Sequence, residues 1–402
     1  MRDMQAGVPR GRLARRHARL SYSHGMLAFA AAIVTAAGLV LAVAAEPPAA
    51  PVAPRAGAQA SAPSSAAPAP TPANPALARA FERAGANAGE LRAALAEIEP
   101  GLRADLEWLI STMPEVDLEQ LKASYLVTNV RLAAEARARA PWGKSIPESI
   151  HRQYVLPYAS VNERRDDWRK DFMDRFSAKA WSFTDPIDAV KWINDSLPDM
   201  LNVHFHATKR RKPDQSPYES MELGWASCTG LSILVIDACR AVGIPARMVG
   251  CPAWKKVQGN HNWVEVWWDR WHNVGDSGSD PRGVDWVEER CRTETDPDDW
   301  VHSVYAAVWR PTNVKYPLVW AFEIEWVPAV NITRFYSDPV DHPFEVPGGG
   351  PADIEVQWAG ELIARASAGP DGKAILPLAR GCHFDVTVRR PGADPDTVTV
   401  RP

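Results

Sequence analysis

A cysteine, a histidine and an aspartate occur in an order that would suit a thiol nucleophile and its proton relay. His261 follows Cys228 by 33 residues, and Asp276 follows His261 by a further 15. A cysteine nucleophile needs a base that removes its proton and a group that orients that base. These residue types predict nucleophilic catalysis if the fold brings all three together.

The cysteine stands at the start of a segment, residues 227–245, whose pattern predicts one buried helix. Ser227 is a suitable N-cap, Gly243 can adopt the left-handed conformation that ends a helix, and Pro245 prevents continuation. Cys228 lies in the first turn, where unpaired N–H groups and the positive end of the helix dipole favour a thiolate and an oxyanion. The alternative interpretation is a small apolar residue that packs in a core.

The histidine and the aspartate lie at the two ends of an expected hairpin. Residues 260–269 alternate in the manner of a strand that begins at His261, and residues 271–274 form the return strand. Because a hairpin brings its outer ends together, we expect His261 and Asp276 to be neighbours. A structural histidine and a turn aspartate are the alternatives.

Four segments, in order, resemble the transglutaminase-like superfamily of papain-type cysteine enzymes. They are Gly224-Trp225-Ala226-Ser227-Cys228-Thr229-Gly230-Leu231-Ser232, Arg240-Ala241-Val242-Gly243-Ile244-Pro245-Ala246-Arg247, His261-Asn262-Trp263-Val264-Glu265-Val266, and Trp271 with Asp276. The resemblance covers about residues 180–280. It implies an α+β, papain/transglutaminase-like core, in which the Cys-bearing helix lies against an antiparallel sheet, and a Cys228-His261-Asp276 triad that forms a thioester with a carboxamide or peptide carbonyl. Asp276 is preferred to Asp280 and Asp285 because it follows the hairpin directly.

The residues do not decide whether the acyl group is transferred to water or to an amine. Transfer to water would be proteolysis, deamidation or removal of a glycan from asparagine, and transfer to an amine would be cross-linking. We expect hydrolysis of protein or peptide amides, because bacterial relatives with this core alone are more often hydrolases. No metal or other cofactor is expected. The alternative is a pseudo-enzyme module that binds a peptide or glycan at the cell surface, which the abundance of Trp would suit.

Other residues are candidates for supporting the site. The Cys228 backbone N–H is one expected oxyanion donor, and Trp225 or Gln215 could supply the second. Arg247 and Glu265 lie on neighbouring expected strands and predict a buried ion pair, because neither charge should be buried alone.

The remainder of the chain divides by composition. Residues 1–45 carry an Arg-rich start and an uncharged run over 26–44, which predict an export signal or a single-pass membrane anchor. This places the protein in the cell envelope or periplasm. An Ala/Pro-rich linker follows at 46–75.

Three folded regions are expected after the linker: a helical N-terminal region at 76–179, the catalytic domain at 180–335 and a small β-sandwich at 340–402. Within them the pattern predicts helices over 163–176 and from Asp185 to Leu197, and a strand over 319–327. The sequence does not decide whether residues 76–180 cover the cleft as a pro-segment or brace the core.

The overall charge of −4 gives no argument for nucleic-acid binding. The number of cysteines, five, is odd, so at least one thiol is expected to stay unpaired if the protein is exported. Their spacing lacks the CxxC pairs of a structural zinc site. The oligomeric state cannot be read from the sequence.

Overall fold

The computed structural model describes residues 74–275 and 286–402. The expected export segment and the linker lie outside these residues, apart from the last two residues of the linker. Within the described ranges, no helix combines the length and the apolar character that crossing a bilayer requires.

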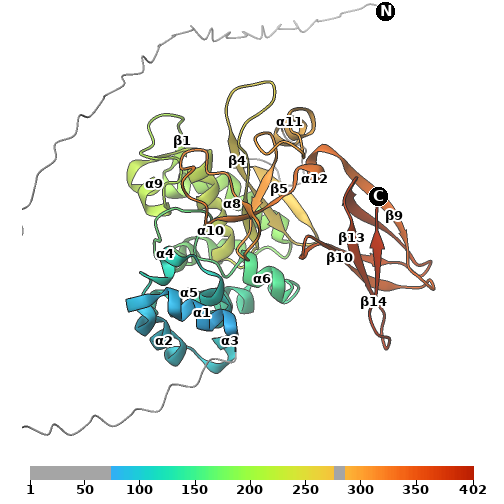
Figure 1. Cartoon of the computed structure of the whole chain (residues 1–402), viewed down its shortest axis with the longest axis horizontal. Helices are drawn as coiled ribbons and strands as arrows, with labels where there is room; N and C mark the ends of the chain where they lie inside the picture. The colour runs from blue at the N-terminus through green and yellow to red at the C-terminus, as the bar shows by residue number, and fades with distance from the viewer. Residues whose placement is uncertain (1–73, 276–285) are drawn as a thin grey trace, which may run out of the picture. The chain divides into compact units, whose positions relative to one another are not determined.

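Six antiparallel strands form the central sheet, in the spatial order β5-β4-β3-β6-β8-β7 (Figure 1). Strands β3 and β4 pair along their whole length, and β4 continues through a tight turn into β5. The expected hairpin is therefore present. The strands are β3 (Ala246–Cys251), β4 (His261–Trp267), β5 (Trp271–Gly275), β6 (Tyr305–Ala307), β7 (Val314–Lys315) and β8 (Pro328–Asn331).

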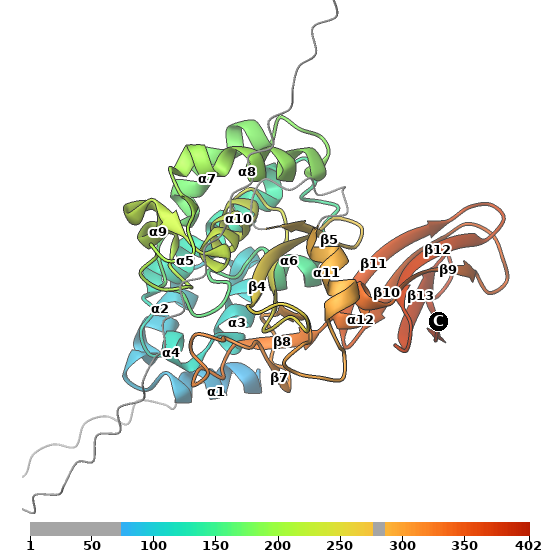
Figure 2. The same ribbon diagram turned by 90° about the horizontal axis from the view of Figure 1, so that it is seen from above.

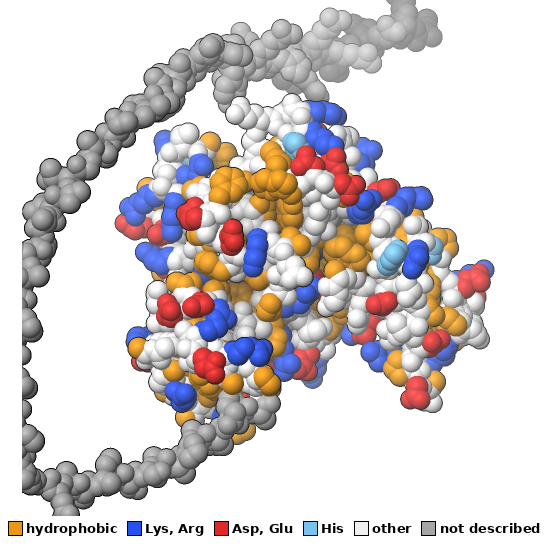
Figure 3. Space-filling view, viewed as in Figure 1, with side chains coloured by type: hydrophobic (Ala, Val, Ile, Leu, Met, Phe, Trp, Pro, Cys, Tyr) orange, Lys and Arg blue, Asp and Glu red, His pale blue; other side chains and the backbone are white. Residues whose placement is uncertain are grey.

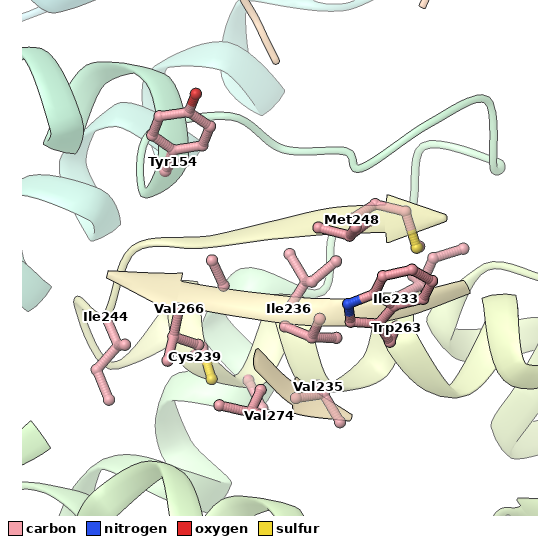
Figure 4. Close-up of a cluster of buried hydrophobic side chains, with 14 of the residues drawn as sticks. Tyr154, Ile233, Val235, Ile236, Cys239, Ile244, Met248, Trp263, Val266 and Val274 are labelled. Atoms are coloured by element: carbon pink, nitrogen blue, oxygen red, sulfur yellow. The ribbon is translucent and has the colours of Figure 1, made fainter. Parts of the chain in front are cut away.

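Helix α10 (Cys228–Ala241) packs on this sheet with almost all of its side chains buried. Figure 4 shows Ile233 and Ile236 of the helix beside Met248 and Trp263 of the strands. The helix ends as expected, because Gly243 has a φ of 80°. A buried helix against an antiparallel sheet confirms the predicted α+β class.

Further helices surround α10 and the sheet. The first helices of the chain share one apolar cluster, whereas α7 and α8 join the cluster around α10. They are α1 (Pro75–Arg83), α2 (Ala88–Glu97), α3 (Arg103–Thr112), α4 (Glu115–Leu118), α5 (Ala123–Arg139), α6 (Glu148–Tyr154), α7 (Arg169–Ala180), α8 (Pro186–Leu201), α9 (Pro217–Leu223), α11 (Trp286–Glu294) and α12 (Thr333–Ser337).

Two buried arginines fasten the end of α6 and the segment after it to α7 and α10. Arg169 of α7 donates to the carbonyl oxygens of residues 155, 156 and 157 at 2.9–3.2 Å. Arg240 of α10 donates to the carbonyls of Tyr154 at 3.1 Å and Ala159 at 2.7 Å. We call this arrangement the arginine clamp. It satisfies backbone oxygens that would otherwise be buried without a donor.

The C-terminal β-domain (β9–β14) has its own apolar core between two small sheets. One sheet has the order β11-β10-β13-β14, and the other pairs β12 with β9. This confirms the predicted β-sandwich, and Figure 2 shows it beside β5 and α12. The strands are β9 (Pro339–Glu345), β10 (Ala352–Trp358), β11 (Glu361–Ala368), β12 (Lys373–Ala379), β13 (Phe384–Arg389) and β14 (Asp396–Val400).

The strand predicted over 319–327 is wrong. The segment turns twice, with Ala321 N donating to the Leu318 carbonyl and Ile324 N to the Ala321 carbonyl, and Phe322 is 65% exposed. Its apolar residues have the pattern of a buried strand in the sequence, but they are not buried together on one face. The adjoining strand is β8, which begins at Pro328.

Two helix predictions also need correction. The helix expected over 163–176 begins only at Arg169, because Glu163 is buried and accepts hydrogen bonds from the N–H groups of Ser160 and Val161. The helix expected to end at Leu197 continues through Pro198 to Leu201, since burial of Leu201 offsets the hydrogen bond that proline removes.

Candidate active site

Cys228 occupies the first position of α10. The Ser227 side chain caps the helix, accepting from Gly230 N at 3.2 Å and donating to the Pro213 carbonyl at 2.6 Å. Cys228 is partly exposed while the rest of α10 is buried. The thiol therefore lies at the positive end of a helix and within reach of solvent.

His261 opens β4 and is held beside the start of α10 by its sequence neighbour. Asn262 Nδ2 donates to Thr229 Oγ1 at 2.7 Å, and the Asn262 carbonyl accepts from Ser232 Oγ at 3.4 Å. Cys228 directly precedes Thr229, and His261 directly precedes Asn262, so this hydrogen bond joins the two residues next to them. The structure thus brings together the start of the helix that carries Cys228 and the start of the strand that carries His261.

The side chain of Asn262 is fixed from a second direction by Tyr316, whose hydroxyl donates to Asn262 Oδ1 at 2.6 Å. Gly250 on β3 makes room for this bond, because a Cβ there would lie 2.1 Å from Asn262 Oδ1 and 2.3 Å from the Tyr316 hydroxyl. Sequence reasoning missed Tyr316 and Gly250 as parts of the site. Asn262 and Thr229 lie within the segments that resemble the superfamily, but the sequence alone indicated no role for either residue.

The imidazole of His261 packs against two indole rings. Trp263 is stacked at 5.8 Å with an angle of 18°, and Trp286 lies 4.7 Å away on α11. Burial, with a smaller contribution from the positive charge of Arg290, lowers the pKa of His261 to about 4. At neutral pH the ring is uncharged and can accept a proton. Its Nε2 atom is buried and makes no hydrogen bond to any described residue.

The third member of the predicted triad lies outside the described residues. This holds for Asp276 and equally for Asp280 and Asp285. The chain leaves β5 at Gly275, which is paired with Val264 of β4, three residues from His261. Asp276 is the next residue in the sequence.

Residues 177–276 match the transglutaminase-like superfamily, a span that includes Cys228, His261 and Asp276. The chain carries a transglutaminase-like domain. This superfamily consists in general of cysteine-type enzymes, which agrees with the resemblance described above.

One solved structure is similar to this chain over part of its length. The crystal structure of red sea bream transglutaminase is 11% identical, with a TM-score of 0.31. That similarity covers 65% of this chain and 65% of the fish chain, which is less than two thirds of its length. No curated protein matches the chain.

The expected buried ion pair of the transglutaminase-like domain is present. Arg247 Nη2 lies 2.7 Å from Glu265 Oε2, and both side chains are almost fully buried. Register explains the contact, because Arg247 is directly opposite Glu265 in the β3–β4 ladder. Their role in supporting catalysis stays a prediction.

The two candidates for the second oxyanion donor differ in their surroundings. Gln215 is fully buried, and its amide donates to the Trp225 carbonyl at 3.1 Å and accepts from Arg211 N at 2.8 Å. It therefore holds the short strand β2 (Trp225–Ala226), which pairs with β1 (His204–Phe205). Trp225 is only partly buried. Of the two, Trp225 is the better placed to contact a substrate.

Proposed function

We propose that the protein is an exported thiol enzyme that hydrolyses amide bonds of proteins or peptides. Cys228 acts as the nucleophile, His261 as the base and Asp276 as the group that orients the imidazole. The observation that carries the proposal is the Asn262–Thr229 hydrogen bond, which ties the start of the cysteine helix to the start of the histidine strand.

The reaction proceeds in two steps. His261 accepts the thiol proton as Cys228 Sγ attacks the carbonyl carbon, and the resulting oxyanion is stabilised by the Cys228 N–H and the helix dipole. The tetrahedral species collapses to a thioester when the amine leaves with the proton from His261. Water then attacks the thioester, gives its proton to His261, and the acid departs as the thiol takes that proton back.

The low pKa of His261 defines how the thiol is activated. Because burial lowers the pKa of His261 to about 4, the imidazole is neutral at pH 7 and can remove the thiol proton during attack.

Mass spectrometry of peptides incubated with and without a primary amine tests this proposal. Cleaved peptides indicate proteolysis, conversion of a side-chain amide to an acid indicates deamidation, and an amine adduct indicates transfer. A glycopeptide arm tests the alternative of a glycan-removing amidase. Cys228→Ala should abolish every product, whereas Cys382→Ala, in the C-terminal β-domain, should not. Turnover by Cys228→Ala would refute the proposal.

A second candidate is a surface module that binds a peptide or glycan without reaction. It is favoured by large apolar side chains exposed next to the site. Phe205 is 57% exposed and pairs with Ala226, two residues before Cys228, and Trp286 is 53% exposed beside His261. Figure 3 shows apolar side chains gathered on this face, over the region between α9 and β4. Alkylation of Cys228 should stop catalysis and leave simple binding largely unchanged.

Export rests on residues 26–44, which lie outside the described part of the chain. We propose that this segment anchors the protein in the membrane and places the enzyme in the cell envelope. Cell fractionation of the full chain beside a variant that lacks residues 1–45 tests it. A soluble cytoplasmic full-length chain would refute it.

A further inference from the structure

A chain of buried polar contacts begins in the C-terminal β-domain. Glu361 of β11 is 3% exposed, and its carboxylate leaves its own domain to accept from Tyr154 Oη at 2.9 Å and Arg310 Nε at 3.2 Å. It also lies 3.6 Å from Arg247 Nη1. A carboxylate this buried needs such partners, and here all of them come from outside the β-domain.

Arg247 carries the chain into the central sheet. Its guanidinium lies 3.7 Å from the centre of the Trp271 ring and donates to Glu265 Oε2 at 2.7–2.8 Å. Glu265 Oε1 accepts from Tyr336 Oη of α12 at 2.6 Å. Burial and the Glu265 carboxylate raise the pKa of Tyr336, so the hydroxyl keeps the proton that it donates.

Tyr336 connects this ion pair to the ring that packs on the imidazole. The Tyr336 hydroxyl accepts from Trp263 Nε1 at 3.0 Å, and its ring meets the Trp263 ring edge-on at 5.8 Å. Trp263 is fully buried and stacks on His261. The contacts therefore run without a break from Glu361 to His261.

A backbone contact reinforces the same connection. The β4–β5 turn pairs with β11, with an isolated bridge between Arg270 and Ala364 and a 2.6 Å hydrogen bond from Arg365 N to the Asp269 carbonyl. The β-domain thus holds the hairpin of His261 at its turn and through its side chains.

We propose that the C-terminal β-domain positions the catalytic imidazole, with Glu361 and Tyr336 as positioning residues that act through Arg247, Glu265 and Trp263. This rests on the proposed function of His261. Neither positioning residue touches the reacting atoms. Each fixes the orientation of Trp263, and Trp263 fixes the plane of the ring.

Tyr336→Phe is the direct test. It removes the only described acceptor of Trp263 Nε1 and should let the two stacked rings shift. A displacement near 1 Å lowers rates by up to about 100-fold. We expect kcat to fall by about tenfold or more with KM little changed, and the rate of iodoacetamide reaction at Cys228 to fall with it.

The pH profile separates positioning from simple stability. Described charged and titratable groups around His261 are Arg290 on α11 and Cys251, which lies opposite His261 in the β3–β4 ladder. These stay unchanged in Tyr336→Phe. If the ring becomes more solvated, the acid limb of Cys228 alkylation should move up from about pH 4 towards the ordinary histidine value near 6.5.

Glu361→Gln is a second variant, which keeps the size of the side chain. It should also move the acid limb of Cys228 alkylation to higher pH, but by less than Tyr336→Phe does. Controls are Tyr305→Phe, which loses one hydrogen bond to the Trp300 carbonyl in the same sheet, and Glu355→Gln, which loses ion pairs within the β-domain. Both controls should keep the wild-type profile. All variants are made in the full chain, and thermal unfolding reports their stability.

Wild-type pH profiles in both Tyr336→Phe and Glu361→Gln would overturn the inference, whatever their melting temperatures. If Tyr336→Phe fails to fold, an unchanged profile in Glu361→Gln overturns it alone. The alkylation readout needs no substrate, so the inference is decided even if Cys228→Ala retains turnover and the proposed function falls.

Discussion

Gly250→Ala is the substitution whose cost follows most directly from the geometry of the site. The added Cβ would lie 2.1 Å from Asn262 Oδ1 and 2.3 Å from Tyr316 Oη, distances that real Cβ atoms do not show. Neither atom is free to move away, because Asn262 is bonded to Thr229 and Tyr316 at 2.6–2.7 Å.

The expected loss in the free energy of unfolding has two parts. Overpacking in a rigid core costs about 1–3 kcal/mol, and losing the Tyr316–Asn262 hydrogen bond costs about 1 kcal/mol more. We expect the free energy of unfolding to fall by about 2–4 kcal/mol in urea titration. Because Asn262 adjoins His261, alkylation of Cys228 should also slow severalfold.

Gly89→Ala is the matched control, since a Cβ at Gly89 in α2 meets nothing within 4 Å. It should leave stability unchanged or raise it by up to about 1 kcal/mol. In an Asn262→Ala background, which removes the closest atom, Gly250→Ala should cost clearly less. A Gly250→Ala protein as stable and as reactive as the wild type would refute the reasoning.

Three further outcomes are expected. Iodoacetamide should modify Cys228 well before Cys239 and Cys251, whose thiol pKa values burial raises to about 12, and peptide mapping would show this order; faster labelling of either buried thiol would contradict it. Turnover should rise as pH increases through about 4, where His261 loses its proton, and a limb near 6.5 in a pH–rate series would contradict the enclosed ring. His151 is buried, which lowers its pKa to about 4, so the unfolded chain binds a proton between pH 6.5 and 4 that the folded chain does not. The contribution of His151 to stability should therefore decline by about 3 kcal/mol as pH falls through that window, and His151→Gln should reduce the total decline in urea titrations at several pH values.

The local parts of the site could be predicted from the sequence because their signals are local. The N-cap at Ser227, the glycine at 243 and the start of a strand at His261 are each signalled within a few residues, and each is present in the structure. The Arg247–Glu265 pair was predictable because adjacent strands of a hairpin-like pattern face each other and buried charges need partners.

The parts that escaped prediction depend on contacts between segments far apart in the chain. Tyr316 reaches Asn262 across 54 residues from a stretch whose pattern suggested only a nearby strand. Glu361 reaches Tyr154 across 207 residues, and nothing near either residue signals the contact. Such bonds are chosen by tertiary packing, which local periodicity does not encode.

The arginine clamp bears on whether the segment after α6 could be an inhibitory prosegment. An inhibitory prosegment must be able to depart intact, yet departure of the segment after α6 would remove three backbone acceptors from the buried Arg169 and two from the buried Arg240. Removal of this segment should therefore destabilise the fold rather than activate a zymogen. The proposed catalytic activity would therefore be present as soon as the chain has folded, without proteolytic maturation in this part of the polypeptide.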